Sequence, residues 1–237
     1  MIISDEYKYV YIELPRTGST AIAKELIELY AGTSILHKHA RYDQFLKMAS
    51  TEQKKYFVFS NIRNPMDEGV SLYLKYFTNH KSKFTEEKPF RNYNVIDRFR
   101  EMKKFNSIKN KGMSFQEYFR KYKKLPYSNQ SLLYHKKFDY IIKYEDLVEN
   151  FNEVLLKIGI SPKRDLPLIN PTEGKKKYFY DYYKGIVGDA KWVYGPYMDY
   201  WNYSWPNEWG EVSPGLFNRL IFHGVFRLKK FYWKLFR

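Results

Sequence analysis

The sequence contains no cysteine and no long apolar run. Without Cys among its 237 residues, the chain forms no disulfide and has neither thiol chemistry nor a Cys-ligated metal site. No stretch of 18 apolar residues occurs, so we expect no transmembrane helix. The opening residues, MIISDEYKYVYIEL, lack the basic and apolar regions of a signal peptide. We therefore expect a cytoplasmic protein.

Acidic residues are scarce relative to basic ones. The chain has 41 Lys and Arg against 26 Asp and Glu, a net charge of +15. Such an excess predicts an anionic partner, which could be a phosphorylated nucleotide, an acidic glycan, a nucleic acid or an anionic membrane. The excess is concentrated: residues 98–124 hold ten basic and two acidic residues, and residues 216–237 hold six basic and none acidic.

Apolar patterns predict an α/β fold. Segments rich in β-branched and aromatic residues predict buried strands at residues 7–14, 55–62 and 138–144. Helical spacing and capping signals predict helices over residues 19–30, 41–50, 65–77 and 114–124, and a further helix capped by Asn150 and ended by Gly159. This alternation predicts a parallel sheet of about four or five strands with helices on both faces.

The predicted domain organisation is simple, because no linker separates two domains. We expect one domain over residues 1–215. Within it, residues 79–112 are polar and basic without a clear period, which predicts a variable insertion or mobile loop. Residues 216–237 predict a basic amphipathic helix, either packed on the domain or lying on an anionic membrane.

The turn PRTGST between the first buried strand and its helix predicts an anion site. The N–H groups and the dipole of a helix N-terminus attract negative charge. Gly18 allows close approach, and the neighbouring side chains add a guanidinium and hydroxyl donors. The residues concerned are Pro15, Arg16, Thr17, Gly18, Ser19 and Thr20. An ordinary glycine turn with a helix cap is the alternative.

A second anion site is predicted after the strand at residues 55–62. Arg63 follows that strand directly, and Ser71 lies on the second turn of the next helix. A guanidinium and a hydroxyl suit a phosphate monoester. The first turn lacks the G-x-x-x-x-G-K-[ST] pattern of ATP-Mg²⁺ sites.

Together, PRTGST, the R-N-P-x-D-x-x-x-S segment and Tyr144-Glu145-Asp146-Leu147 resemble the sulfotransferase superfamily over residues 7–160. The resemblance implies a P-loop-like three-layer fold that binds 3'-phosphoadenosine 5'-phosphosulfate (PAPS) without a metal and releases PAP. It implies that the PRTGST turn holds the 5'-phosphosulfate, and that Arg63 and Ser71 hold the 3'-phosphate. Arg16 stands where many members have Lys, and Glu68 stands where Arg is frequent.

Two of the five histidines, His37 and His39, lie two residues apart in a segment that we expect to be extended. Imidazole has a suitable pKa for a base that deprotonates a hydroxyl. The segment resembles H-x-H-x-x-Y in glycan-uronyl 2-O-sulfotransferases, which implies His39 as the base with His37 assisting. Surface histidines, or an acidic residue as the base, are the alternatives.

The implied function is sulfuryl transfer from PAPS to a hydroxyl, on a glycan or glycolipid that is acidic or membrane-linked. Residues 178–206 also resemble the aromatic close of carbohydrate-type members. Two other functions stay open. One is a P-loop, NTP-dependent, kinase-like transferase. The other is a non-catalytic binder of nucleic acid or anionic membrane; the site at Arg63 argues against this reading.

Overall fold

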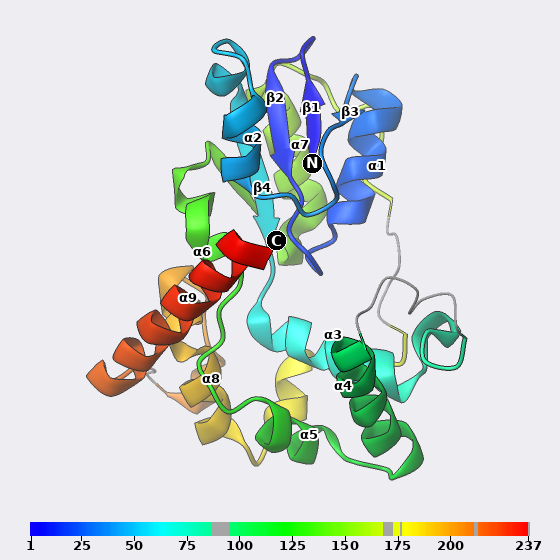
Figure 1. The fold of residues 1–237 in the computed structure, drawn as a ribbon, viewed down its shortest axis with the longest axis vertical. Coiled ribbons are helices and arrows are strands. Elements are labelled where there is room, and N and C mark those ends of the chain that lie inside the picture. The colour runs from blue at the N-terminus through cyan, green and yellow to red at the C-terminus, as the bar shows by residue number, and fades with distance from the viewer. Residues whose placement is uncertain (87–94, 168–172, 176, 211–212, 237) are drawn as a thin grey trace. The chain divides into compact units, whose positions relative to one another are not determined.

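A computed structural model describes residues 1–86, 95–167, 173–175, 177–210 and 213–236 (Figure 1). The chain divides into two compact units. The first, which we term the sheet unit, comprises residues 1–64 and 129–170; the second, the helical unit, comprises residues 65–128 and 171–237. Each unit is therefore built from two separate stretches of sequence.

A mostly parallel five-stranded sheet forms the centre of the sheet unit. Its order is β3-β1-β2-β4-β5. The strands are β1 (Ile2–Ser4), β2 (Tyr9–Ile12), β3 (Thr33–Ser34), β4 (Phe57–Ile62) and β5 (Tyr140–Lys143). β2, β4 and β5 run parallel, whereas β1 pairs antiparallel with both its neighbours. The three predicted strands are confirmed, and the antiparallel β1 is an addition to the expected parallel sheet.

Helices cover both faces of this sheet. Tyr9 and Tyr11 of β2 pack with α1 (Ser19–Leu29) and α7 (Leu147–Lys157). Because successive strand residues point to opposite faces, Val10 and Ile12 pack instead with residues of α2 (Tyr42–Met48). The shorter elements are α6 (Ser131–Tyr134) and the 3-10 helices η1 (Gln53–Lys55), η5 (His135–Lys137) and η6 (Tyr144–Asp146). Burial on both faces explains the continuous apolar run of β2.

The predicted cap of α7 is wrong. The helix begins at Leu147, three residues before Asn150, although it ends before Gly159 as expected. Asn150 Oδ1 instead accepts a hydrogen bond of 2.9 Å from the backbone N–H of Lys143. Asn150 therefore ties α7 to the end of β5.

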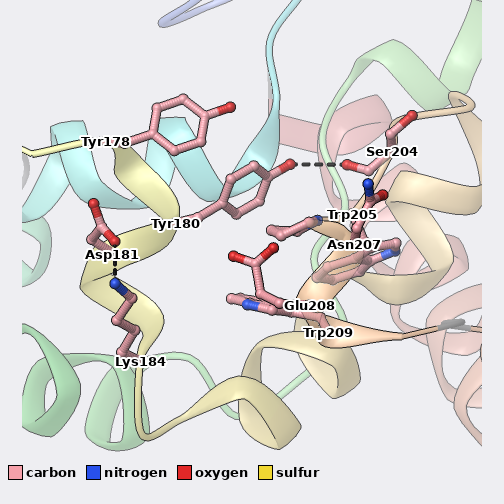
Figure 2. A pocket seen from close by; sticks show the side chains of 10 residues that line it. Tyr178, Tyr180, Asp181, Lys184, Ser204, Trp205, Asn207, Glu208 and Trp209 are labelled. Carbon is pink, nitrogen blue, oxygen red and sulfur yellow. Dashed lines mark hydrogen bonds and ion pairs between the residues drawn. The ribbon is translucent and has the colours of Figure 1, made fainter.

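The helical unit has a core rich in aromatic rings. Its helices are α3 (Pro65–Phe77), α4 (Val95–Phe105), α5 (Phe115–Tyr122), α8 (Val187–Tyr200) and α9 (Leu216–Phe236). Shorter turns are η2 (His80–Ser82), the π-helical η4 (Asn106–Asn110), η7 (Phe179–Tyr183) and η8 (Asn207–Trp209). Tyr73, Phe119 and Tyr194 are among the buried rings that join these elements. η7 and η8 also line a pocket, shown in Figure 2.

Several helical predictions hold in this unit. The predicted helices at 65–77 and 216–237 form, and Ser114 with Glu117 makes the expected capping box of α5. The stretch 79–112, expected to be an insertion or mobile loop, contains the helix α4. Residues 87–94 of that stretch lie outside the described part of the chain. Among the described residues, no helix combines the length and apolar character needed to cross a membrane.

A buried histidine in the sheet unit makes stability depend on pH. His135 is 3% exposed, and its Nε2 lies 2.9 Å from Ser60 Oγ. Since Ser60 donates its own proton to the carbonyl oxygen of Ile12, His135 Nε2 must be the donor to Ser60. Burial lowers the pKa of His135 to about 3 from 6.5.

We predict that stability falls as the pH drops from 7.5 to 5. In this window the unfolded chain protonates this histidine and the folded protein does not, which costs about 2 kcal/mol at pH 5. Urea unfolding at both pH values measures the loss. His135→Phe should show a smaller loss, and an equal loss in that variant would contradict the assignment.

Candidate functional site

The predicted anion loop has a left-handed backbone at two positions. Gly18, the N-cap of α1, has φ +79°, and Arg16 has φ +67°. Thr17 Oγ1 donates a hydrogen bond of 2.7 Å to the carbonyl oxygen of Leu14, which closes the turn. The N–H group of Ala21 bonds to the carbonyl oxygen of Gly18 at 3.0 Å, whereas those of Ser19 and Thr20 have no acceptor within the helix. They point toward the loop, with the positive end of the helix dipole.

Two side chains at the end of β4 and just after it hydrogen-bond to this loop. Asn61 is fully buried, accepts a hydrogen bond of 2.9 Å from the Tyr11 hydroxyl and donates to the carbonyl oxygen of Thr17. Two residues on, Arg63 Nη1 donates to the carbonyl oxygen of Arg16 at 3.2 Å. Both side chains therefore hold the loop by hydrogen bonds to its backbone carbonyls.

The segment after β5 completes the support. The Tyr144 ring lies under the Arg63 guanidinium, with 4.1 Å between the ring centre and the guanidinium carbon. A Cβ atom at Gly18 would lie 3.0 Å from Tyr144 Cδ2. Glu145 Oε1 accepts a hydrogen bond of 2.7 Å from the backbone N–H of Asn64. Tyr144 therefore contacts both Gly18 and Arg63, and a side chain at position 18 would have to displace the ring by a few tenths of an ångström.

The histidine segment lies against the same loop, but it is not extended. β3 ends at Ser34, and left-handed φ values at Leu36 (+56°) and His39 (+66°) turn the chain. The expectation that the two histidines face the same way from a strand is therefore wrong. His37 is exposed, whereas His39 is half-buried.

Two contacts connect this turn to the loop. His39 Nδ1 lies 3.0 Å from the carbonyl oxygen of Glu13, an acceptor, so Nδ1 carries the proton and Nε2 carries the lone pair. Burial lowers the pKa of His39, and the bond to Glu13 opposes this effect only partly. Lys38 Nζ donates to Thr20 Oγ1 at 2.9 Å, which places an ammonium at the N-terminus of α1. The turn thus supplies a neutral imidazole and a cation beside the loop.

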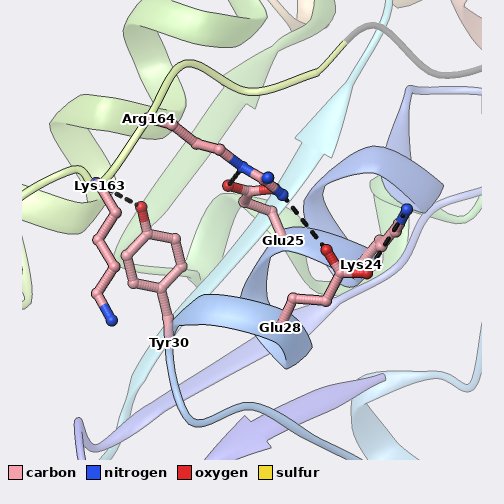
Figure 3. A network of polar contacts seen from close by, with 6 residues as sticks. All are labelled: Lys24, Glu25, Glu28, Tyr30, Lys163 and Arg164. Atoms are coloured by element: carbon pink, nitrogen blue, oxygen red, sulfur yellow. Dashed lines mark hydrogen bonds and ion pairs between the residues drawn. The ribbon is translucent and has the colours of Figure 1, made fainter.

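The other end of α1 is fixed by an ion pair between a buried glutamate and an exposed arginine (Figure 3). Glu25 is 0% exposed, and its carboxylate accepts two hydrogen bonds of 2.8 Å from Arg164. Arg164 also reaches Glu28 at 3.3 Å, and the Tyr30 hydroxyl accepts the backbone N–H of Lys163. A bidentate guanidinium fixes both position and orientation of its partner. These contacts hold α1, and with it the loop at its N-terminus.

Most predicted site residues gather in the sheet unit: the loop from Pro15 to Thr20, Arg63 and His39. Ser71 belongs to the helical unit, where it lies buried on α3. Glu68, on the same helix, accepts a hydrogen bond from Tyr127. Among the described residues, no three His, Asp or Glu side chains cluster closely enough to hold a metal ion.

Sequence reasoning missed Asn61 and Lys38, and it quoted Tyr144 only as part of a motif. The polar pair Ser60-Asn61 near the end of the strand KYFVFSNI was the available signal for Asn61. Lys38 carried no such signal, because its contact with Thr20 depends on the turn.

Comparison with known protein families gives one result. The sequence profile described as "Sulfotransferase family" matches residues 1–182. The chain therefore belongs to the sulfotransferase family, whose members transfer a sulfonate group from a donor to an acceptor. The match includes the anion loop, Arg63, Ser71 and the Tyr144 segment. Neither the curated proteins nor the solved structures contain a significant match.

The Gly18 contact gives a matched pair of variants. Gly18 and Gly159 share φ +79°, but a Cβ at Gly159 meets nothing within 4 Å. Replacement by Ala therefore introduces backbone strain of about 1 kcal/mol at both positions. Only Gly18→Ala should also push Tyr144 away and abolish the rise in melting temperature caused by PAP. Equal PAP stabilisation of the two variants would contradict this account of the loop.

Proposed function

We propose that this protein transfers the sulfuryl group of PAPS to a hydroxyl of a glycan or glycolipid. The observation that carries the proposal is the joint support of the Gly18 loop and Arg63 by one side chain, Tyr144. A loop at a helix N-terminus and a guanidinium next to it suit the two phosphate ends of one nucleotide. The fold we propose for the whole chain is the P-loop-like three-layer fold of this family.

In this proposal the residues have separate roles. The N–H groups of α1, with Arg16, Ser19 and Thr20, bind the 5'-phosphosulfate. Arg63 and Ser71 bind the 3'-phosphate, and Ser71 comes from the helical unit. Arg63 is 7% exposed and rests on Tyr144, so little side-chain entropy is lost on binding.

The reaction is an in-line displacement at sulfur. The acceptor oxygen forms a bond to sulfur while the bond from sulfur to the 5'-phosphate oxygen breaks, and PAP leaves with the electron pair. His39 Nε2 takes the acceptor proton. Charge on the leaving phosphate is stabilised by the helix N-terminus, by Arg16 and by the Lys38 ammonium. Catalysis then depends on positioning and electrostatics, as in phosphoryl transfer.

A membrane-linked acceptor is favoured by α9. Asn218 and Phe222 are buried, and Asn218 bonds to the carbonyl oxygen of Trp192 on α8 at 2.9 Å. The opposite face is apolar and open: its side chains are between 60% and 73% exposed. They are Phe217, Leu220, Leu228 and Phe231. Exposed cationic side chains, Arg227 and Lys230, lie beside this stripe. We propose that α9 lies on anionic lipid.

The base assignment predicts different effects for the two histidines. Labelled PAPS with a panel of glycans, glycolipids, phenols and peptides first identifies an acceptor. His39→Ala should then lose at least 100-fold in kcat and keep its stabilisation by PAP, whereas His37→Ala, at the exposed assisting residue, should also keep that stabilisation and lose far less in kcat. Because burial lowers the pKa of His39, the loss of kcat on acidification should have its midpoint below pH 6.5. Full activity of His39→Ala would remove it from the mechanism.

Ligand stabilisation separates this function from its alternatives. PAP should raise the melting temperature more than ATP with Mg²⁺ does. A larger effect of ATP with Mg²⁺ would favour a kinase-like transferase. No effect of either nucleotide, together with strongly salt-dependent binding of polyanions, would favour a non-catalytic binder.

The α9 proposal predicts sedimentation with phosphatidylserine vesicles but not with phosphatidylcholine vesicles. Replacing the four exposed apolar side chains of α9 by Ser should reduce binding at least tenfold, because the buried apolar area is lost. Phe99→Ser, at a residue of α4 that is also 68% exposed, is the control and should bind normally. Equal binding of the four-residue variant and the wild type would contradict membrane docking.

A further inference from the structure

The helical unit contains an open pocket of about 390 Å³, between η7 and the segment 204–209 (Figure 2). This volume falls within the range of small-ligand sites. Aromatic rings line it from both sides: Tyr178 and Tyr180 from η7 and its N-cap, Trp205 and Trp209 from the other wall. The pocket plays no part in the nucleotide site proposed above.

The rings of this pocket are held in fixed positions. The Tyr180 hydroxyl donates to the carbonyl oxygen of Ser204 at 2.9 Å, which joins the two walls. Trp209 contacts Tyr180 edge to face, with 5.7 Å between ring centres. Its ring is tilted by 33° relative to that of Trp205, with 5.6 Å between centres. Lys191 of α8 donates to the carbonyl oxygen of Trp209 at 2.6 Å. The aromatic surface is therefore formed before a ligand arrives, which lowers the entropy cost of binding.

Polar groups around the rings combine donors and acceptors. Asp181 and Lys184 form an ion pair of 2.6 Å, and the Glu208 carboxylate extends from the opposite wall toward η7 (Figure 2). The hydrogen bond with Asp181 raises the pKa of Lys184, and the charge of Glu208 adds to this effect. Asn207 contributes an amide to the same lining.

The charge of this lining differs from that of the whole chain. Two carboxylates and one ammonium give the pocket a charge of −1, whereas the chain carries +15. A negative pocket repels uronate and sulfate groups. Aromatic cages also bind quaternary ammonium ions, but such an ion would be repelled by the Lys184 ammonium. It also could not accept a hydrogen bond from the donors in the lining.

We propose that this pocket binds an uncharged pyranose ring of a sugar chain. The C–H faces of a pyranose pack on aromatic faces, whose π-clouds carry partial negative charge. Its hydroxyls both donate and accept hydrogen bonds, as the mixture of Asp181, Lys184, Asn207 and Glu208 requires. The view that this ring belongs to the sulfated acceptor rests on the proposed function, whereas sugar binding itself does not.

Isothermal titration calorimetry of the full chain tests the pocket. The probes are cellotetraose, maltotetraose and chitotetraose as neutral sugars, a heparin tetrasaccharide as the acidic comparison and choline as the cationic one. At least one neutral sugar should bind, and more tightly than both comparison probes. Trp209→Ala should weaken that binding at least tenfold, and the conservative Glu208→Gln at least threefold.

Trp192→Phe, at a tryptophan of α8 outside this pocket, is the matched control and should bind the sugar as the wild type does. PAP stabilisation should be unchanged in all three variants, so failure of the sugar site and failure of the nucleotide site are distinguishable. Three results would overturn the proposal. The first is binding of only heparin or choline, and the second is no binding of any neutral sugar at 10-fold excess over millimolar protein. The third is an unchanged sugar affinity in both Trp209→Ala and Glu208→Gln.

Discussion

The contact of Tyr144 with both Gly18 and Arg63 is the constraint on which the site depends. A left-handed glycine places the N-terminus of α1 against the tyrosine ring, and the same ring carries the Arg63 guanidinium. Asn61 and Arg63 then hold the loop by its carbonyl oxygens. A shift of the tyrosine would therefore disturb both Gly18 and Arg63.

This assembly places positive charge where a leaving phosphate would need it. The helix N-terminus, Arg16 and the Lys38 ammonium all belong to the sheet unit, and His39 is connected to the same loop through Glu13. The pair of the buried Glu25 and the exposed Arg164 fixes α1 at its far end. In the proposed reaction, these groups are held by contacts that exist without substrate. The helical unit carries Ser71 on α3 and the aromatic pocket proposed above to bind sugar.

The sequence allowed prediction of those parts whose signals are local. A few neighbouring residues are enough to predict the apolar runs of β2, β4 and β5, the Ser114 cap and the glycine turn at 15–20. Three features could not be predicted in this way. β1 has only three residues, the division into two units has no linker, and the turn at Leu36 and His39 uses left-handed φ values that carry no side-chain signal.

Long-range contacts explain the remaining differences. Asn150 looked like a helix cap, but it bonds to Lys143 at the end of β5. The support of the loop by Asn61 joins residues 44 positions apart, and the bond from Asn64 to Glu145 spans 81. Such partners are set by strand order, because β2, β4 and β5 are neighbours in the sheet. Local patterns predicted the glycine loop, and the sheet showed which long-range contacts hold it.

The most direct measurement is a crystal structure of the protein with PAP. The account predicts the 5'-phosphate on the N–H groups that follow Gly18 and the 3'-phosphate on the Arg63 guanidinium, with Tyr144 in place between them. A bound PAP that contacts neither group, or one whose two phosphates both lie away from Tyr144, would contradict it.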